Sequence, residues 1–202
     1  MRTAKTVLTV IQERGKQKKP IERVYKLLFN RELYLNAYAK LYPNNGAMTK
    51  GVTDETVDGM SIQKIDRMIE ILREEKYQWK PARREYIKKK NGKKRPLGIP
   101  VWGDKVLQEV MRQILEAYYE PQFSEHSHGF RPNRGCHTAL QEIQVWKGTR
   151  WFIEGDISQY FDTIDHKILL EILARNIHDG RFIRLVSNML EAGYLEEWKF
   201  KQ

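Results

Sequence analysis

The dipeptide Asn91-Gly92 restricts the fold of this chain more than any other local feature. A type I′ turn requires positive φ at both central residues, and Asn-Gly is the pair that most readily adopts it. The flanking segments, residues 85–90 and 93–99, are therefore predicted as the two strands of an antiparallel hairpin. Pro100 should end the second strand, because proline cannot donate a hydrogen bond to the ladder.

This predicted hairpin is densely basic. Residues 79–95 contain nine lysines and arginines and a single acid, Glu85. Side chains alternate between the faces of a strand, so the cations cannot all lie on one surface, but a two-stranded ribbon of this kind can lie along a phosphate backbone. Its aromatic neighbours Tyr77, Trp79 and Tyr86 are candidates for stacking on bases. The alternative is a solvated hairpin whose lysines discourage edge-to-edge pairing.

Helices are expected on both sides of the hairpin. Apolar residues at helical spacing predict a helix from Pro20 to Leu41, which ends at the breaker cluster of residues 43–46. Further helices are predicted at Ser61 and Asp104, each as an N-cap, and near His137, 165–176 and 181–192. Residues 151–157 are predicted to form a buried strand. Helices with a hairpin and a strand, but without β-α-β alternation, predict an α+β fold.

Charge is distributed unevenly along the chain. The formal net charge is +10, yet residues 151–202 carry nine acids against six bases, which leaves +13 on residues 1–150. This division is expected if one part grips a polyanion and the other holds cations; a basic protein that is merely soluble is the simpler alternative. The single cysteine, Cys136, excludes an internal disulfide and suits a reducing, bacterial-type cytoplasm. No apolar run approaches the ~20 residues of a membrane span.

The segment SHGFRPNRGCHTAL, residues 127–140, combines arginines with possible metal ligands. Zinc ligation by His126, His128, Cys136 and His137 is one interpretation, but their spacing matches no common zinc site. We therefore expect these histidines to be ordinary surface or capping residues.

Asp156 follows the apolar residues WFI, at the point where the predicted strand leaves the core. A carboxylate fixed by a strand end can ligate a metal, because its position is set while its oxygens stay accessible. Glu154 lies two residues earlier on the same strand face, as a second acid or a polar edge residue. Asp162 and Asp165 have a simpler explanation, since carboxylates at a helix start cap free N–H groups.

Four segments, in this order, resemble the reverse transcriptase of group II intron maturases. They are the early loop KGVTDETVDGMS, the basic hairpin with RPLGIP, the segment with the GFRP-x-R core, and GDISQYFDTIDH. The resemblance implies a right-hand polymerase: an N-terminal helical extension and loop over residues 1–60, fingers over 61–149, and the beginning of a palm over 150–202.

The resemblance also assigns roles around Asp156. Asp156 corresponds to the first catalytic aspartate, a ligand of two Mg²⁺ ions, and the Ile157 carbonyl to a further ligand. Phe161 corresponds to the steric gate beneath the incoming sugar. Ser158 and Gln159 fall where backbone N–H groups face the triphosphate of a deoxynucleotide.

In the fingers, Lys89 and Arg95 correspond to the basic pair that grips the nucleotide phosphates. The residues expected to contact RNA or template are Lys88, Lys90, Lys93, Lys94, Arg131 and Arg134. The implied partners are intron RNA or an RNA template, a DNA primer and a deoxynucleoside triphosphate.

The chain departs from the family pattern at its end. It contains no Asp-Asp pair and no Pro-Gln-Gly block, and the resemblance stops at GYLEEWKF, before the second catalytic motif. We therefore expect a fragment of an RNA-directed DNA polymerase that also binds group II intron RNA as a splicing maturase, and that binds RNA without polymerising. Such a fragment would expose apolar palm surface, through which it could associate with a second copy of itself. The alternatives are a non-catalytic module for structured RNA, or a reverse transcriptase of a retron or defence lineage.

Overall fold

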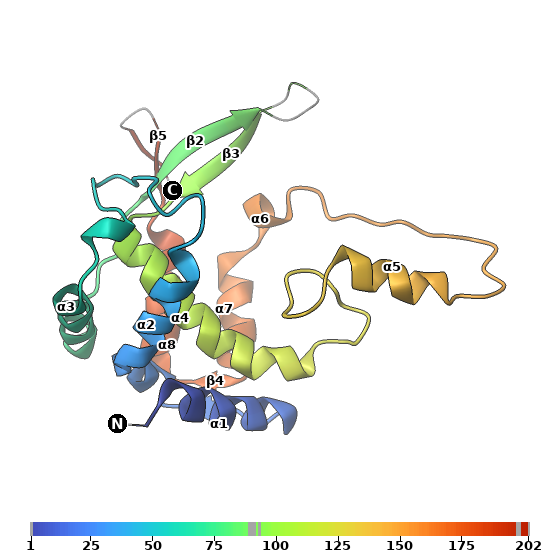
Figure 1. Ribbon diagram of the computed structural model, residues 1–202, viewed down its shortest axis with the longest axis horizontal. Helices are drawn as coiled ribbons and strands as arrows, with labels where there is room; N and C mark the ends of the chain where they lie inside the picture. Colours follow the sequence, from blue (N-terminus) through green and yellow to red (C-terminus); the bar gives the residue numbers. More distant parts are fainter. Residues whose placement is uncertain (1, 89–91, 93, 197–198, 202) are drawn as a thin grey trace.

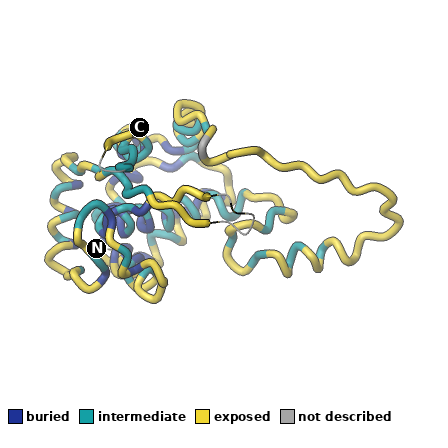
Figure 2. The backbone as a smooth tube through the Cα atoms, turned by 90° about the horizontal axis from the view of Figure 1, so that it is seen from above, coloured by how far each residue is buried: buried dark blue, intermediate teal, exposed yellow. Residues whose placement is uncertain are grey.

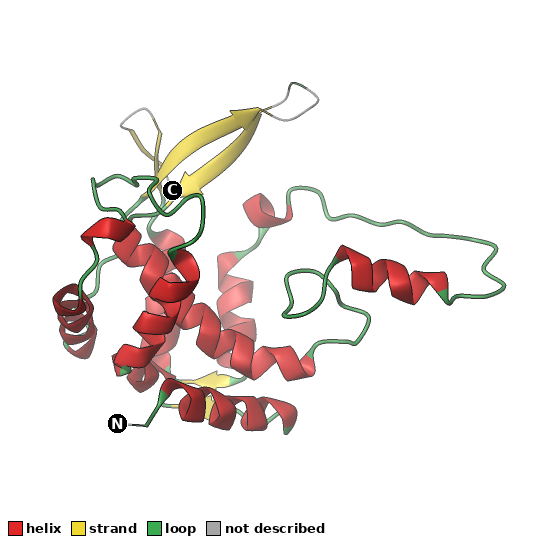
Figure 3. Ribbon diagram, in the orientation of Figure 1, coloured by secondary structure: helices red, strands yellow, loops and turns green. Residues whose placement is uncertain are grey.

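The computed structural model describes residues 2–88, 92, 94–196 and 199–201, without the side chain of Asp162. Helices and small sheets are mixed along the chain (Figures 1 and 3), which confirms the predicted α+β class. The first elements are α1 (Ala4–Lys16), β1 (Ile21–Glu22), η1 (Val24–Phe29), α2 (Arg31–Leu41), η2 (Val57–Gly59), α3 (Ile62–Arg73), β2 (Ala82–Lys88) and β3 (Lys94–Ile99). They are followed by α4 (Trp102–Tyr119), η3 (Glu120–Gln122), α5 (Cys136–Gln144), α6 (Tyr160–Thr163), α7 (His166–Ala174), β4 (Ile177–His178), α8 (Gly180–Glu191), β5 (Tyr194–Glu196) and β6 (Lys199–Lys201).

The helix α4 forms the centre of the core (Figure 1). The residues of α4 that have no exposed surface are Val106, Leu107, Val110, Ile114 and Tyr118. Burying such a side chain contributes about 1.5–3 kcal/mol. The helices α1 and α2 pack against α4. Among the described helices, none combines the length and apolar composition needed to cross a bilayer.

A short parallel strand pair joins segments from the two ends of the chain. In the β1–β4 pair, Ile21 lies opposite Ile177, and both side chains are buried. The buried residue after β4, Asp179, accepts hydrogen bonds from the Tyr25 N–H at 2.9 Å and from the Arg181 N–H at the start of α8 at 3.2 Å. Residues near both ends therefore belong to one core.

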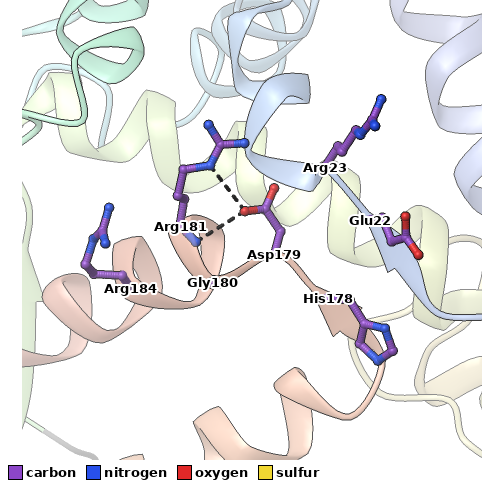
Figure 4. A pocket seen from close by; sticks show the side chains of 7 residues that line it. All are labelled: Glu22, Arg23, His178, Asp179, Gly180, Arg181 and Arg184. Carbon is purple, nitrogen blue, oxygen red and sulfur yellow. Dashed lines mark hydrogen bonds and ion pairs between the residues drawn. The ribbon is translucent and has the colours of Figure 1, made fainter.

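An open hollow of about 580 Å³ lies where these two parallel strands end (Figure 4). Arg23, Arg181 and Arg184 border it, and the last two form ion pairs with Glu75. In Figure 4, Arg181 lies beside Asp179 while Arg23 points away from both. The three arginine head groups do not converge on one point and so do not form an anion site, and Arg181 and Arg184 instead link α8 to Glu75.

The basic hairpin belongs to a second sheet, with the order β3-β2-β5-β6. The predicted hairpin is confirmed with shifted boundaries, because β2 begins at Ala82 rather than at residue 85. Gly92 has the expected positive φ of 79°. Residues 89–91 and 93, which include most of the predicted turn, lie outside the described residues. The parallel pairing of β2 with β5 was not predicted.

The N-terminal region differs from the sequence expectation. The predicted helix over residues 20–41 is wrong in its first part, where β1 and η1 precede α2. Arg23 takes a left-handed conformation with φ of 54°, and Asn30 caps α2 by accepting from the Glu32 N–H at 3.0 Å. The helix α1, capped by Thr3, was not predicted.

The start of α4 also corrects a prediction. The helix begins at Trp102 after Val101, and Asp104 is buried in its first turn instead of capping it. Asp104 accepts hydrogen bonds from the Tyr77 hydroxyl at 2.7 Å and from the Lys80 N–H at 3.0 Å. By contrast, Ser61 and Asp165 cap α3 and α7 as predicted.

The predicted strand over residues 151–157 is wrong. These residues belong to an arm, residues 123–159, that projects from the core and is largely exposed (Figures 1 and 2). A strand is stable only when a neighbour satisfies its N–H and C=O groups, and both described sheets lie elsewhere. Trp151 and Ile153 are consequently 88% and 94% exposed. Apolar composition predicted burial, but nothing in the described chain covers this segment.

The contact between α1 and α4 gives a stability prediction. A Cβ on Gly15 would lie 2.1 Å from the Tyr118 carbonyl oxygen, so the helices would have to separate. We expect Gly15→Ala to lower the free energy of unfolding by about 1–3 kcal/mol, measured by chemical denaturation. Gly180→Ala in α8 is the matched control, because its Cβ would meet nothing within 4 Å. Equal stability of the two variants would contradict the close approach.

Candidate functional site

The two faces of the basic hairpin carry different side chains. Lys88 lies directly opposite Lys94, and Tyr86 is on the same face, with the Lys94 Nζ 5.9 Å from the centre of its ring. Like charges opposite each other in an antiparallel pair destabilise it. This face therefore gains stability when a polyanion lies across it.

The other face of the hairpin carries Arg83, Glu85, Ile87 and Arg95, with Ile87 opposite Arg95. Arg83 is paired with Glu85, whereas Arg95 makes no ion pair within the described part of the chain. Arg95 is therefore free to meet an anion. Three residues predicted to act here, Lys89, Lys90 and Lys93, lie outside the described residues.

The base of the hairpin is held by β5 and β6. The Arg84 guanidinium lies 3.7 Å from the centre of the Tyr194 ring, and the Tyr86 hydroxyl donates to Glu196. Glu196 also pairs with Lys201. The hydrogen bonds from Lys201 and Tyr86 hold the pKa of Glu196 below its usual value. The base of the hairpin is thus packed and hydrogen-bonded against β5 and β6, while Lys88 and Lys94 on its outer part have no described anionic partner.

The aromatic neighbours of the hairpin play different roles from those expected. The Tyr77 hydroxyl donates to Asp104, and the Trp79 Nε1 donates to the Leu185 carbonyl at 3.0 Å. Both rings pack against the core. Of the three predicted stacking residues, Tyr86 is the one that presents an exposed ring.

A cleft of about 1,220 Å³ brings together three of the segments recognised in the sequence. Gly98 comes from the hairpin, Phe130 from the GFRP loop, and Phe161 from α6. Phe130 is fully exposed, with φ of 56°, a conformation that non-glycine residues adopt rarely. The loop therefore holds this ring at the mouth of the cleft.

One side of α4 forms the floor of this cleft. Arg112 makes hydrogen bonds of 2.7 and 2.8 Å to Glu109, and it also pairs with Glu116. Burial alone would raise the pKa of Glu109, but Arg112 and Lys40 hold it below its usual value. Arg112 is thus neutralised by neighbouring acids, whereas Lys105, which also lines the cleft from α4, donates to the carbonyls of Gly46 and Thr49. The hairpin beside the cleft supplies further cations that would attract phosphates.

Asp156 lies in the exposed part of the arm, and it is not among the residues that line the cleft. Ile157 is exposed beside it, and Ser158 and Gln159 form a turn in which Gln159 has φ of 51°. No group of three or more His, Cys, Asp or Glu side chains suited to a metal occurs among the described residues. A site for two closely spaced dications requires more than one carboxylate, so the described residues do not complete one.

Arg131 organises the GFRP loop instead of facing solvent. Its side chain is only 8% exposed. Its Nε donates to Glu120 at 3.0 Å, and its Nη1 donates to the carbonyls of Ser124 and Ser127 at 2.6 and 2.8 Å. Its Nη2 lies 2.9 Å from the Glu120 carboxylate. Because the guanidinium is fully engaged, contact with a template would first require these bonds to break.

The second arginine and the histidines of this loop also bond within it. Arg134 donates to the Glu125 carbonyl. His128 contacts Glu142 through Nε2 at 2.7 Å and Thr138 through Nδ1 at 2.8 Å, and His126 shares the same carboxylate. These hydrogen bonds lower the pKa of Glu142. The histidines link the loop to α5, which agrees with the structural role expected for them.

The family described as reverse transcriptase (RNA-dependent DNA polymerase) matches residues 87–201. The group II intron-encoded protein LtrA of Lactococcus lactis subsp. cremoris is 49% identical over 180 residues, which cover 88% of this chain and 30% of LtrA. A 91 kDa protein in the cob intron of Schizosaccharomyces pombe is 46% identical over 206 residues, covering 98% of this chain and 26% of that protein.

A third relative is the nuclear intron maturase 1, mitochondrial, of Arabidopsis thaliana. It is 36% identical over 93 residues, which cover 46% of this chain and 13% of the maturase. The chain thus spans less than a third of the length of each of these relatives.

The network around Arg131 gives the next prediction. We expect Arg131→Lys to expose the loop, because an ammonium cannot make all the hydrogen bonds of the guanidinium. Amide hydrogen exchange over residues 124–135 should become faster, corresponding to a local loss of about 1–3 kcal/mol. Arg134→Lys is the matched control, with a smaller expected effect because Arg134 has a single carbonyl partner. Unchanged exchange in Arg131→Lys would show that the network does not hold the loop.

Proposed function

The chain belongs to the reverse transcriptase (RNA-dependent DNA polymerase) family, and from that premise we propose its function. It supplies the fingers and the first part of the palm of an RNA-directed DNA polymerase of the group II intron type. On its own it binds structured RNA without polymerising. The whole protein also binds its intron RNA as a maturase.

The observation that carries this proposal is the cleft shared by Gly98, Phe130 and Phe161. Residues far apart in the sequence, each from a segment with a role in nucleotide or template handling in the family, line one hollow beside the basic hairpin. The proposed parts are the extension over residues 1–60, the fingers over 61–149 and the beginning of the palm over 150–202. Because one hydrophobic core includes residues from all three, they are parts of a shared scaffold.

The proposed roles follow from side-chain chemistry. Arg95, with Lys89, neutralises and orients the triphosphate of a deoxynucleotide, since guanidinium and ammonium groups form strong charge-assisted hydrogen bonds to phosphate. Phe161 places an apolar ring beneath the sugar, where a 2′-hydroxyl would be desolvated without a partner. The N–H groups of Ser158 and Gln159 face the triphosphate.

Reverse transcriptases generally use a divalent metal. We propose that the Asp156 carboxylate and the Ile157 carbonyl contribute to a Mg²⁺ site in the whole protein. When bound, such an ion activates a hydroxyl nucleophile and offsets phosphate charge. The remaining carboxylates of that site are not among the described residues.

The role of Asp156 is tested by primer extension. A longer polypeptide, in which the family's adjacent aspartate pair follows this chain, is expected to extend a DNA primer on an RNA template in the presence of Mg²⁺. Asp156→Ala should abolish extension, because it removes a metal ligand, while Glu154→Ala should retain it. Full primer extension by Asp156→Ala would contradict the role of Asp156 as a metal ligand. The present chain alone is expected to be inactive in the same assay.

A second candidate function is the binding of structured RNA without any use of Asp156. It is favoured by the +13 charge of residues 1–150 and by the opposed pair Lys88 and Lys94. If about six phosphates of a single strand are neutralised, log affinity should fall with log salt at a slope of about −4.

RNA binding by the hairpin is tested on this chain. Changing both Lys88 and Lys94 to Gln should weaken binding to a single-stranded RNA several-fold and reduce the salt slope by about 1–1.5, because two phosphate contacts are lost. Changing Lys5 and Lys19 to Gln removes the same charge near α1, on the opposite side of the core from the hairpin (Figure 1). An equal loss in both double variants would indicate that net charge, and not the hairpin, determines binding.

A further inference from the structure

A separate cavity of about 490 Å³ lies at the root of the hairpin. Lys80 lines it just before β2, and Val101 lines it just after β3. Its other walls come from the loop around η2, from α3 and from the first turn of α4. This volume is within the ~300–1,000 Å³ typical of small-ligand sites, and an RNA strand lying along the hairpin would pass its mouth.

The inner surface combines apolar groups with acceptors of hydrogen bonds. Met60, Met68 and Trp102 line the cavity together with the buried carboxylate of Asp104, while Glu55 is an exposed acid of the lining. Burial raises the pKa of Asp104, and each of its oxygens has one described hydrogen-bond donor. A carboxylate oxygen has room for a further donor. The interior therefore suits a flat, partly apolar group that carries N–H donors.

One buried donor at this cavity lacks a partner. Trp102 is 3% exposed, and its Nε1 has no hydrogen-bond partner among the described residues. A buried unsatisfied donor is unfavourable, and an acceptor on a ligand that reached it would remove this penalty. The helix α4 also begins here, after Val101 and with no capping side chain in the described part of the chain.

The rim of the cavity is cationic. Lys64, Arg67, Lys76 and Lys80 surround it. Lys76 is paired with Glu74, while Lys64, Arg67 and Lys80 make no ion pair with any described residue. Acceptors inside and cations outside match a nucleotide, whose base carries N–H donors and whose phosphate is anionic. The rim cations would repel a basic peptide, and the inner carboxylate of Asp104 would repel an acidic one.

We propose that this cavity receives one unpaired nucleobase of RNA bound along the hairpin, with its phosphates on the cationic rim. The proposal rests on the RNA-binding function proposed above. Bases with an exocyclic amino group (adenine, guanine and cytosine) are favoured over uracil, because the carboxylates accept from amino groups.

The test uses a stem-loop RNA with 2-aminopurine in its single-stranded loop and the same RNA with an abasic residue at that position. Insertion of the base should change the 2-aminopurine emission on binding. Met60→Trp fills the cavity and should weaken binding of the first RNA by roughly 5- to 150-fold, the range for loss of one stacked base. It should also remove the emission change, without altering affinity for the abasic RNA or the salt slope.

Two further variants keep this test interpretable. Thr56→Phe narrows the cavity from the other end of η2, at a residue whose side chain makes no capping hydrogen bond in the described structure. It should reproduce Met60→Trp. Ile62→Trp makes a comparable change at an exposed residue of α3 outside the cavity lining, and it should behave as the unchanged chain. Thermal unfolding checks that all three variants are folded.

The outcomes separate this proposal from the function on which it rests. Unchanged binding and emission in folded Met60→Trp and Thr56→Phe would overturn the base site, while RNA binding through the hairpin would stand. An equal loss of affinity for the abasic RNA in these variants would also overturn the base site. So would a free nucleoside monophosphate that binds as tightly as the RNA. Failure of the unchanged chain to bind either RNA would instead overturn the proposed function itself.

Discussion

The burial of α4 is the constraint on which the rest of the structure depends. Its inner face holds α1 and α2, while another side forms the floor of the large cleft. The hairpin ends just before this helix, and the GFRP loop begins just after η3. Because a helix of 18 residues is about 27 Å long, α4 fixes the separation of these two elements. A change in its packing would therefore alter the cleft through the positions of both.

Charge divides the molecule by role. Several arginines are engaged in ion pairs: Arg112 with Glu109, Arg131 with Glu120, and Arg184 with Glu75. On the outer hairpin and around the cavity at its root, Lys88, Lys94 and Arg67 have no described anionic partner. The ion-paired arginines hold segments of the fold together. The cations without a described partner form the surface on which an RNA phosphate backbone would lie. The cations without a described anionic partner thus include residues of the outer hairpin and of the rim of the cavity at its root.

Local signals in the sequence predicted local structure well. Asn91-Gly92 predicted the hairpin, and Ser61 and Asp165 predicted two helix starts, because turn and capping preferences act within a few residues. The failures involve partners distant in sequence. Residues 151–157 have strand composition but no described neighbour to pair with. Tertiary contacts, which periodicity does not encode, determine three further features. These are the parallel β2–β5 pairing, the burial of Asp104 with its hydrogen bond from Tyr77, and the hydrogen-bond network of Arg131. The sequence assigned a role to Phe161 and singled out the segments that contain Gly98 and Phe130, but it did not predict the cleft that these residues share.

The β1–β4 pair has a consequence for how the chain is made. Ile21 meets Ile177, and the Tyr25 N–H bonds to Asp179, which follows it by 154 residues. During synthesis, the early segment leaves the ribosome long before its partner strand exists. The entropic cost of closing so long a loop grows only slowly with its length. The time that passes before the partner strand is synthesised is therefore a greater obstacle to this pairing than its thermodynamic cost. Nascent β1 and η1 therefore lack their partners β4 and α8 until nearly the whole of this segment has emerged, a period during which chaperones would find them exposed.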